Sequence, residues 1–155
     1  MNTLTVGDKA PNFEAKDNQG IVRKLSDYSG KKLVVFFYPK ASTPGCTAEA
    51  CNLRDHHSSL QEKGIAVLGV SADSASKHQK FIAKYDLPFP LIADTERKVI
   101  EAFGVWGEKK FMGRVYDGIH RTTYVIGEDG TVLKRFDKVK TKAHAEEILD
   151  VLNAQ

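Results

Sequence analysis

The residues that join the first long apolar run to the segment after it constrain this chain most. Residues 33–38 are aliphatic or aromatic, and such a run is typical of a buried strand. A short loop with two prolines, a glycine and two hydroxyl side chains follows, and then helical periodicity begins. In α/β proteins, the junction between a strand and the next helix usually carries the ligands and the chemistry. The only two cysteines, Cys46 and Cys51, lie just beyond this loop.

Cys46 is predicted to lie in the first turn of that helix. Thr43 is suited to the helix N-cap, and Pro44 to the first helical position, where its missing N–H is not needed. Unpaired backbone N–H groups and the positive end of the helix dipole would then stabilise an anion at Cys46. Because the thiolate is the nucleophilic form, this placement predicts a reactive cysteine. The alternative is a small buried hydrophobic residue, which is what most free cysteines are.

Cys51 follows five residues later on the predicted helix. Five residues correspond to a rotation of roughly 500°, so the two side chains point about 140° apart and their Cα atoms lie roughly 8–9 Å apart. That separation is too long for a disulfide without backbone movement. A permanent structural bridge is therefore not expected, whereas a bond that forms after the helix opens is compatible with the spacing.

The same residues resemble a known family. Residues 39–46, Pro-Lys-Ala-Ser-Thr-Pro-Gly-Cys, fit the peroxiredoxin pattern Pro-x-x-x-Thr-x-x-Cys, and residues 43–51 resemble the bacterioferritin-comigratory, or Q-type, subfamily. The resemblance extends from residues 6–13 to the final helix. It implies a thioredoxin-like fold and a thiol-dependent peroxidase that reduces hydrogen peroxide and organic hydroperoxides to water and alcohols in antioxidant defence.

The resemblance also implies a role for each cysteine. Cys46 would be the peroxidatic thiol that attacks the hydroperoxide and becomes a sulfenic acid. Cys51 would be the resolving thiol that forms an intramolecular disulfide with it, which thioredoxin or a similar dithiol then reduces. No cofactor is required for this cycle. A monomer is expected, because both thiols belong to one helix.

The site needs hydrogen-bond donors and a fixed cation to stabilise the departing oxygen. Thr43 offers a hydroxyl, the backbone N–H groups of Gly45 and Cys46 can point to the same place, and Pro39 can shield the thiolate. The resemblance implies that Arg121 is the cation, since a guanidinium can hold the thiolate charged and donate to the peroxide. The alternative for Arg121 is an ion pair at the surface.

Glu49 matches the Q-type string and is expected to orient Arg121 or Thr43, with a solvent-exposed helix face as the alternative. A copper or zinc site made by Cys46, Cys51 and His120 is disfavoured, because ligand spacings such as C-x₂-C are absent and one helix splays the thiols apart. A rival function is a redox sensor or metallochaperone on the same fold, which would not need Thr43 or Pro39.

The rest of the chain predicts alternating strands and helices. The predicted elements are a hairpin within residues 13–25, a strand at 32–38, a helix from 44 to about 63, a strand at 65–71, a helix capped by Ser74, a strand at 91–93, a short helix closed by Gly104, a loop at 104–120, a hairpin at 121–136 and a final helix from about Thr141. This order predicts a single α/β domain over residues 1–155, with a mixed central sheet flanked by helices. The pattern alone also allows a flavodoxin-like sheet.

Charge and hydropathy exclude other classes of protein. The net charge of +3, from 23 basic and 20 acidic residues, is spread along the chain, so no nucleic-acid-binding stripe is indicated. No basic segment followed by an apolar one opens the sequence, and no apolar run is long enough for a membrane span. The expectation is a cytoplasmic protein with no membrane partner, where paired thiols are usually catalytic, redox-sensing or metal-binding.

Overall fold

A five-stranded sheet forms the centre of the computed structural model, which describes residues 4–153. Its strands, in spatial order, are β5 (Leu91–Ala93), β4 (Ile65–Ser71), β3 (Lys32–Phe37), β8 (Thr122–Ile126) and β9 (Val132–Phe136). The three strands from β5 to β3 run parallel, β8 is antiparallel to β3, and β9 is antiparallel to β8. The predicted mixed sheet is confirmed, and an all-parallel flavodoxin-like sheet is excluded.

β3 lies in the middle of the sheet and is buried on both faces. Successive side chains of a strand point to opposite faces, so Val34 and Phe36 face one way while Val35 and Phe37 face the other. All four are at most 1% exposed. A strand covered on both faces reads as an unbroken apolar run, which explains why residues 33–38 carry no polar alternation.

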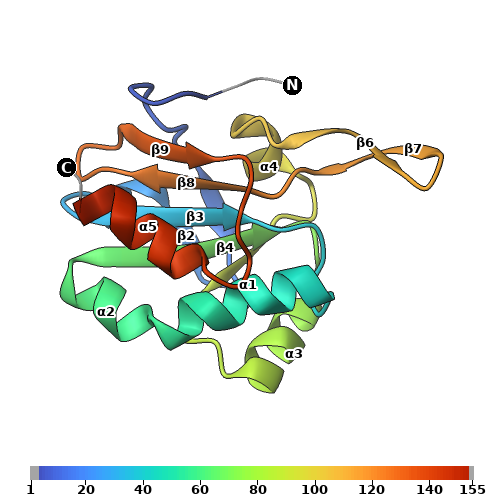
Figure 1. The fold of residues 1–155 in the computed structure, drawn as a ribbon, viewed down its shortest axis with the longest axis horizontal. Helices are drawn as coiled ribbons and strands as arrows, with labels where there is room; N and C mark the ends of the chain where they lie inside the picture. Colours follow the sequence, from blue (N-terminus) through green and yellow to red (C-terminus); the bar gives the residue numbers. More distant parts are fainter. Residues whose placement is uncertain (1–3, 154–155) are drawn as a thin grey trace.

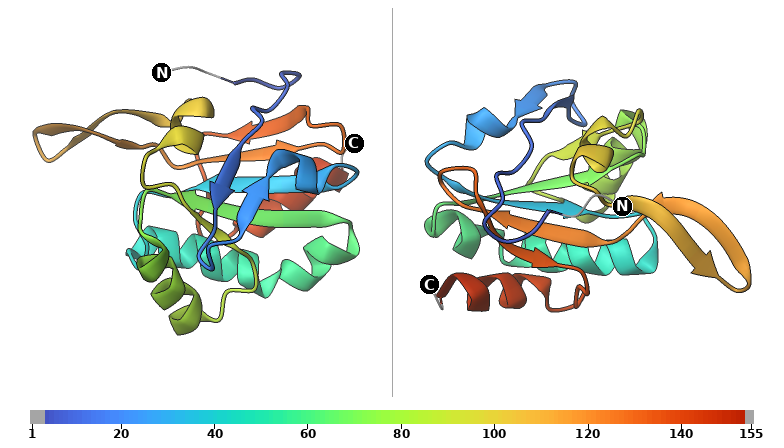
Figure 2. Two further views of the ribbon diagram at one scale, coloured as in Figure 1. Left: turned by 180° about the vertical axis from the view of Figure 1, so that it is seen from behind. Right: turned by 90° about the horizontal axis from the view of Figure 1, so that it is seen from above.

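Two layers cover the two faces of the sheet. On one face lie α1 (Pro44–Asp55), α2 (His57–Glu62), α3 (Ala75–Tyr85) and α5 (His144–Asn153) (Figure 1). The other face is covered by the hairpin of β1 (Glu14–Lys16) and β2 (Val22–Lys24), the 3₁₀ helix η1 (Leu25–Tyr28) and α4 (Lys98–Ala102) (Figure 2). The predicted N-terminal hairpin is confirmed. Within residues 4–153, no helix is both long and apolar enough to cross a membrane.

The single helix predicted from residue 44 to about residue 63 is wrong in one respect, because it breaks at His56. The His56 ring lies with Nδ1 3.0 Å from the carbonyl oxygen of Asn52, the oxygen that the backbone N–H of residue 56 would bond in a regular helix. That N–H instead donates to the carbonyl of Arg54. The side chain therefore competes with the helical ladder and separates α1 from α2.

The loop predicted for residues 104–120 is also wrong. β6 (Trp106–Phe111) and β7 (Arg114–Ile119) form a hairpin that projects from the body of the protein (Figures 1 and 2). Its turn uses Met112 and Gly113, both at positive φ. Asn-Gly or Asp-Gly is the usual signal for such a turn, and methionine gives none. Most of the ribbon is exposed, so it also lacks the alternation that marks a half-buried strand.

The final helix begins at His144, three residues later than predicted from Thr141. Its first turn is bonded to α1, since the backbone N–H of Ala145 donates to Asn52 Oδ1 at 2.7 Å. The Asn52 amide also donates to the carbonyl oxygen of Lys142 at 3.1 Å. The start of α5 is therefore determined by a side chain from another helix, which local sequence does not reveal.

Candidate functional site

Cys46 is the third residue of α1 and lies in its first turn, as predicted. Pro44 occupies the first helical position, and Thr43 has the extended backbone of an N-cap residue. The thiol is 1% exposed and belongs to the core between the sheet and its helices. The fold thus places the sulfur at the end of the helix where partial positive charge gathers, beside the end of β3.

The hydroxyl of Thr43 does not cap the helix, which corrects the prediction for that side chain. It donates to the carbonyl oxygen of Lys40 at 2.8 Å instead, and no side-chain bond closes the start of α1. The hydroxyl therefore does not occupy the N–H groups of the first turn near Cys46. Its own lone pairs are left to accept a hydrogen bond.

Arg121 and Cys46 lie in direct contact. Nη2 of Arg121 is 3.3 Å from the sulfur of Cys46. The sheet register explains the contact: Thr122 in β8 pairs with Phe37 in β3, so Arg121 lies beside the strand end from which the cysteine loop departs. Gly45 also contributes, because a Cβ at that position would lie 3.1 Å from Nη2. Any side chain at residue 45 would crowd the guanidinium.

Glu49 holds the other side of the guanidinium. Its Oε1 accepts a hydrogen bond from Arg121 Nη1 at 2.7 Å, and the side chain is fully buried. The interpretation of Glu49 as part of a solvent-exposed face is therefore wrong. Burial raises the pKa of Glu49 to about 7, and Arg121 opposes that shift. Arg121 is ion-paired, as its alternative interpretation held, but with a buried carboxylate and beside the cysteine.

The charge of Arg121 is secured by its surroundings. Burial alone would lower its pKa, but the sulfur of Cys46 and the carboxylate of Glu49 outweigh that effect, so the pKa is raised. A guanidinium is in any case protonated throughout the physiological range. The site therefore holds a permanent cation that contacts the sulfur directly.

Cys51 lies in the same helix and is partly exposed, and both thiols are free. Because α1 continues unbroken to Asp55, this is a conformation in which the two cysteines are held apart. Pro39 is half-buried where β3 ends. The loop after it is fixed by a hydrogen bond of 2.7 Å from the backbone N–H of Ala41 to Asp73 Oδ2. The shielding role of Pro39 stays a prediction.

The three candidate metal ligands do not come together in the described part of the chain. His120 lies with Nε2 3.0 Å from the carbonyl oxygen of Glu108 in the projecting hairpin. Among residues 4–153, no group of three or more histidine, cysteine or acidic side chains is placed to hold a metal ion. Cys46, Cys51 and His120 therefore do not form a preassembled metal site here.

Sequence reasoning missed His144, which lies behind Glu49. Its ring is fully buried, with Nε2 2.8 Å from Thr123 Oγ1 and 3.6 Å from Glu49 Oε2. A signal was available in the final helix: residue 144 shares one face with Ile148 and Leu152, both buried. A histidine at a core position of an amphipathic helix needs a polar partner inside the protein.

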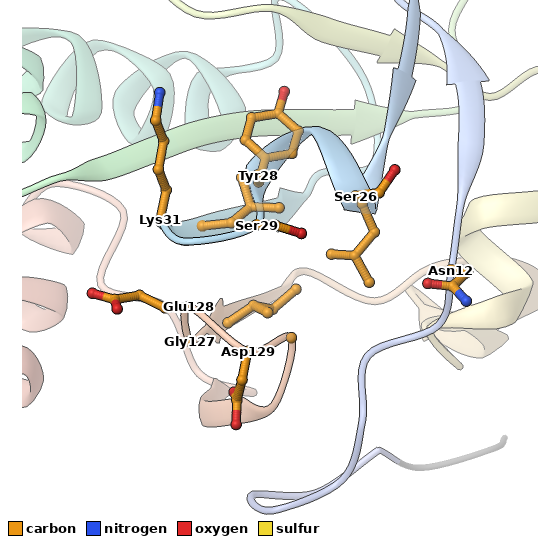
Figure 3. A pocket seen from close by; sticks show the side chains of 12 residues that line it. Asn12, Ser26, Tyr28, Ser29, Lys31, Gly127, Glu128 and Asp129 are labelled. Carbon is orange, nitrogen blue, oxygen red and sulfur yellow. The ribbon is translucent and has the colours of Figure 1, made fainter.

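A hollow elsewhere on the molecule is separate from this cluster. It is lined by Asn12, Tyr28, Lys31 and the turn between β8 and β9, among others (Figure 3). Its walls include Leu33, near the start of β3, whereas Cys46 follows the end of that strand. The hollow therefore opens near the start of β3, at the end of that strand opposite to Cys46, and neither cysteine lines it.

Sequence comparison places the chain in a protein family and finds relatives that are nearly half identical to it. The AhpC/TSA family matches residues 6–135. Peroxiredoxin Bcp of Bacillus subtilis is 49% identical over 150 residues, covering 97% of this chain and 96% of the relative. Peroxiredoxin Bcp of Escherichia coli is 47% identical over 152 residues, covering 98% and 97%.

Comparison with solved structures finds proteins of the same family. A PrxQ mutant from Xylella fastidiosa superposes with a TM-score of 0.92 at 33% identity, covering 99% of this chain and 98% of the other. The bacterioferritin comigratory protein of Xanthomonas campestris, described for its alkyl peroxide reduction activity, gives a TM-score of 0.86 at 35% identity, with coverage of 92% and 90%. These neighbours have the thioredoxin-like fold that the sequence predicted.

Proposed function

Because the chain belongs to the AhpC/TSA family of peroxiredoxins and reduces peroxides with thiols, we propose that Cys46 is the thiol that attacks the peroxide and Cys51 the thiol that resolves the product. One observation carries this assignment. The buried Cys46 sulfur lies in the first turn of α1, 3.3 Å from a guanidinium that Glu49 holds in place. Within residues 4–153, no cationic side chain hydrogen-bonds to Cys51, and the nearby Arg54 bonds to Asp55 and to the carbonyl oxygen of Tyr85 instead.

The proposed reaction begins with the thiolate of Cys46. Its sulfur bonds to one peroxide oxygen, the O–O bond breaks, and the other oxygen leaves as hydroxide or alkoxide. Protonation of that leaving oxygen gives water or an alcohol, while the sulfur becomes a sulfenic acid. Arg121 and the first-turn N–H groups of α1 supply charge and donors where negative charge develops. Their positions are fixed before the reaction, so little reorganisation is needed.

The remaining residues of the site support this step. The Thr43 hydroxyl gives its hydrogen to Lys40, so its oxygen can accept the hydrogen of a bound hydroperoxide and orient it. Pro39 limits water access at the end of β3. Glu49 keeps the guanidinium of Arg121 directed at the sulfur. Organic hydroperoxides are included as substrates because the Xanthomonas campestris neighbour is described for alkyl peroxide reduction.

The second half of the proposed cycle uses Cys51. Its thiolate attacks the sulfenic sulfur, the S–O bond breaks, and hydroxide leaves and takes up a proton from solvent to become water, so that an intramolecular disulfide forms. Thioredoxin, or a similar dithiol, then reduces that bond by exchange. We propose that the protein does this as a monomer, because both thiols lie in one helix. We also propose that residues 1–155 form a single domain. A cytoplasmic location fits a cycle that depends on a reducing dithiol.

A direct assay separates this function from a redox sensor or metallochaperone. The purified protein, stripped of metal by a chelator, is mixed with hydrogen peroxide, thioredoxin and the enzyme that regenerates thioredoxin. We expect continuous consumption of peroxide over many turnovers. A sensor would instead consume about one equivalent and stop.

Replacing Cys51 by serine is expected to preserve one oxidation but remove efficient turnover. Cys46 and its cation are unchanged, so a sulfenic acid forms, but no thiol in the same chain can condense with it. That sulfenic acid is then oxidised more easily to the sulfinic acid by excess peroxide. Intact-mass spectra measure both products, with wild type as the control. Full thioredoxin-linked turnover by this variant would show that Cys51 is not the resolving thiol.

Formation of the disulfide is expected to unwind α1. Its helical geometry holds the Cα atoms of the two cysteines roughly 8–9 Å apart, beyond the range of a disulfide. Oxidation should therefore open residues from about 42 to 55, and such local openings can cost far less than global unfolding. Amide hydrogen exchange of the reduced and oxidised protein measures this. Loss of protection is expected in residues 46–54, with α3 as the unaffected control; equal protection of residues 46–54 in both states would rule out the opening.

A further inference from the structure

Asn52, the residue after Cys51, connects α1 to the start of α5. Its amide nitrogen donates to the carbonyl oxygen of Lys142 at 3.1 Å, and its Oδ1 accepts the backbone N–H of Ala145 at 2.7 Å. Both polar atoms of the side chain are therefore used on one short stretch of backbone, where the chain enters α5 beside α1 (Figure 1). The helix that contains both cysteines is thus bonded to a segment distant in the sequence.

The bond to Ala145 supplies a partner that α5 itself cannot supply. The first N–H groups of a helix have no carbonyl of their own helix to bond, and Ala145 is the second residue of α5. The N–H of Glu147, one turn further, donates to the carbonyl oxygen of Ala143 at 3.1 Å. The amide of Ala145 therefore reports on the contact with α1, whereas the amide of Glu147 reports on the start of α5 alone.

A second polar contact joins the same two helices but is weaker. His56 Nε2 lies 2.8 Å from Glu146 Oε1, and these side chains are 35% and 46% exposed. Ion pairs in contact with solvent contribute little to stability, because water competes for both partners. Asn52, with two hydrogen bonds to backbone groups, is the firmer of the two connections.

The contact of Asn52 with α5 is incompatible with a disulfide between the two cysteines. A helix holds the Cα atoms of Cys46 and Cys51 roughly 8–9 Å apart, so the backbone between them has to unwind before the bond can form. In a helix, the N–H of Asn52 bonds to the carbonyl of residue 48, which lies inside that segment. Only residues 52–55 of α1 would then remain, and a single turn is not stable as a helix on its own. Unwinding therefore releases Asn52 as well.

We propose that Asn52 is a positioning residue for the resolving step: its hydrogen bonds to α5 have to break before Cys51 reaches Cys46, so they set how long the sulfenic acid lasts. In that step the sulfur of Cys51 bonds to the sulfur of Cys46, the S–O bond breaks, and hydroxide leaves and takes up a proton from solvent. The inference rests on the proposed roles of the two cysteines. Asn52 acts through the backbone of α1 and not on the reacting sulfur atoms.

Asn52→Ala is expected to speed formation of the disulfide about tenfold, because two hydrogen bonds of ordinary strength no longer oppose the opening of α1. The rate constant for oxidation of Cys46 should stay as in wild type, since Arg121 and Glu49 are unchanged. The measurement is rapid mixing with one equivalent of hydrogen peroxide, an acid quench at successive times, and intact-mass spectra that separate sulfenic acid from disulfide. The peroxide concentration that inactivates half of the protein as sulfinic acid should rise by a similar factor.

Gln79→Ala provides the matched control. Gln79 in α3 also uses a side-chain amide to bond a distant backbone carbonyl, that of Asn18, at 2.7 Å. Its removal should lower stability in the same way but release no part of α1, so the rate of disulfide formation should not change. An unchanged rate in Asn52→Ala, or an equal rise in Gln79→Ala, would overturn the proposal.

Amide hydrogen exchange of the wild type, resolved by NMR, tests the proposal even if Asn52→Ala does not fold. On oxidation the N–H of Ala145 should lose its protection, whereas the N–H of Glu147 should keep it, because Ile148 and Leu152 hold α5 in the core. A disulfide between Cys46 and Cys51 with full protection at Ala145 would overturn the role of Asn52 alone. Failure of that disulfide to form would overturn the assignment of the cysteines, and the role of Asn52 with it.

Discussion

Replacing Cys46 by serine is expected to reduce peroxide consumption to the uncatalysed background. A hydroxyl at neutral pH is a far weaker nucleophile than a thiolate, and the reaction has no other step by which the O–O bond can be broken. The guanidinium of Arg121 would remain in place, held by Glu49, but no thiol would lie beside it. The measurement is steady-state consumption of hydrogen peroxide with thioredoxin as reductant.

The matched control for that variant is Cys51→Ser, which removes the other thiol of the same helix. Under single-turnover conditions it should oxidise at a rate close to that of wild type, whereas Cys46→Ser should not react. Serine is nearly the same size as cysteine, so either change is expected to leave the helix intact. Substantial turnover by Cys46→Ser with Cys51 intact would mean that the roles of the two cysteines have been assigned wrongly.

Replacing Arg121 by alanine is expected to slow oxidation of Cys46 by roughly 10²–10³-fold, the usual loss when one positioned donor is removed from a buried site. The change removes the cation 3.3 Å from the sulfur, so the negative charge that develops on the departing oxygen loses its counter-ion. Arg121→Lys restores the charge but cannot contact Glu49 and the sulfur with two nitrogens of one planar group, so partial rescue is expected. Rapid-mixing kinetics measure the rate constant for oxidation of Cys46 in the wild type and in both variants.

Arg135→Ala provides the control for Arg121→Ala. Arg135 is also largely buried and ion-paired, with Nε 2.6 Å from Asp137 Oδ1, but it lies in β9 and makes no contact with Cys46. Its removal should lower stability without a matching loss of oxidation rate. If Arg121→Ala left the rate constant for oxidation of Cys46 unchanged, Arg121 would be only a structural ion pair with Glu49.

The local chemistry of residues 39–51 was accessible from the sequence because neighbouring residues determine it. Pro44 and the extended Thr43 start the helix, and their positions alone place Cys46 in the first turn. The mixed sheet was predictable for a similar reason, since most of its strands are apolar runs bounded by glycines and other turn residues, and a Gly-Glu-Asp-Gly turn precedes β9. Arg121 was different: only the family resemblance distinguished it from 22 other basic residues, and the pairing of β3 with β8 brings it to the cysteine.

What the sequence did not reveal depends on contacts between distant segments. The burial of Glu49 follows from the packing of α5 beside α1. Its spacing from Cys46, Ala50 and Leu53 places it on the inward face of α1, but a glutamate is usually exposed, so the spacing alone did not predict its burial. The break at His56 arises from a ring that bonds a backbone carbonyl, a choice that helix propensity does not register. The β6–β7 hairpin lacked both a hydrophobic period and a common turn residue at Met112. In each case the deciding interaction is absent from the local sequence.

The roles of the two cysteines can be tested most directly by mapping oxidised sulfur after one equivalent of hydrogen peroxide. Peptide mass spectrometry of the wild type is expected to find a single disulfide between Cys46 and Cys51 of the same chain. In Cys51→Ser, it should find one added oxygen atom on the peptide that contains Cys46. A wild-type bond that joins two chains would contradict intramolecular resolution, and an oxygen adduct on Cys51 in Cys46→Ser, formed as fast as in wild type, would contradict the assignment of Cys46 as the attacking thiol.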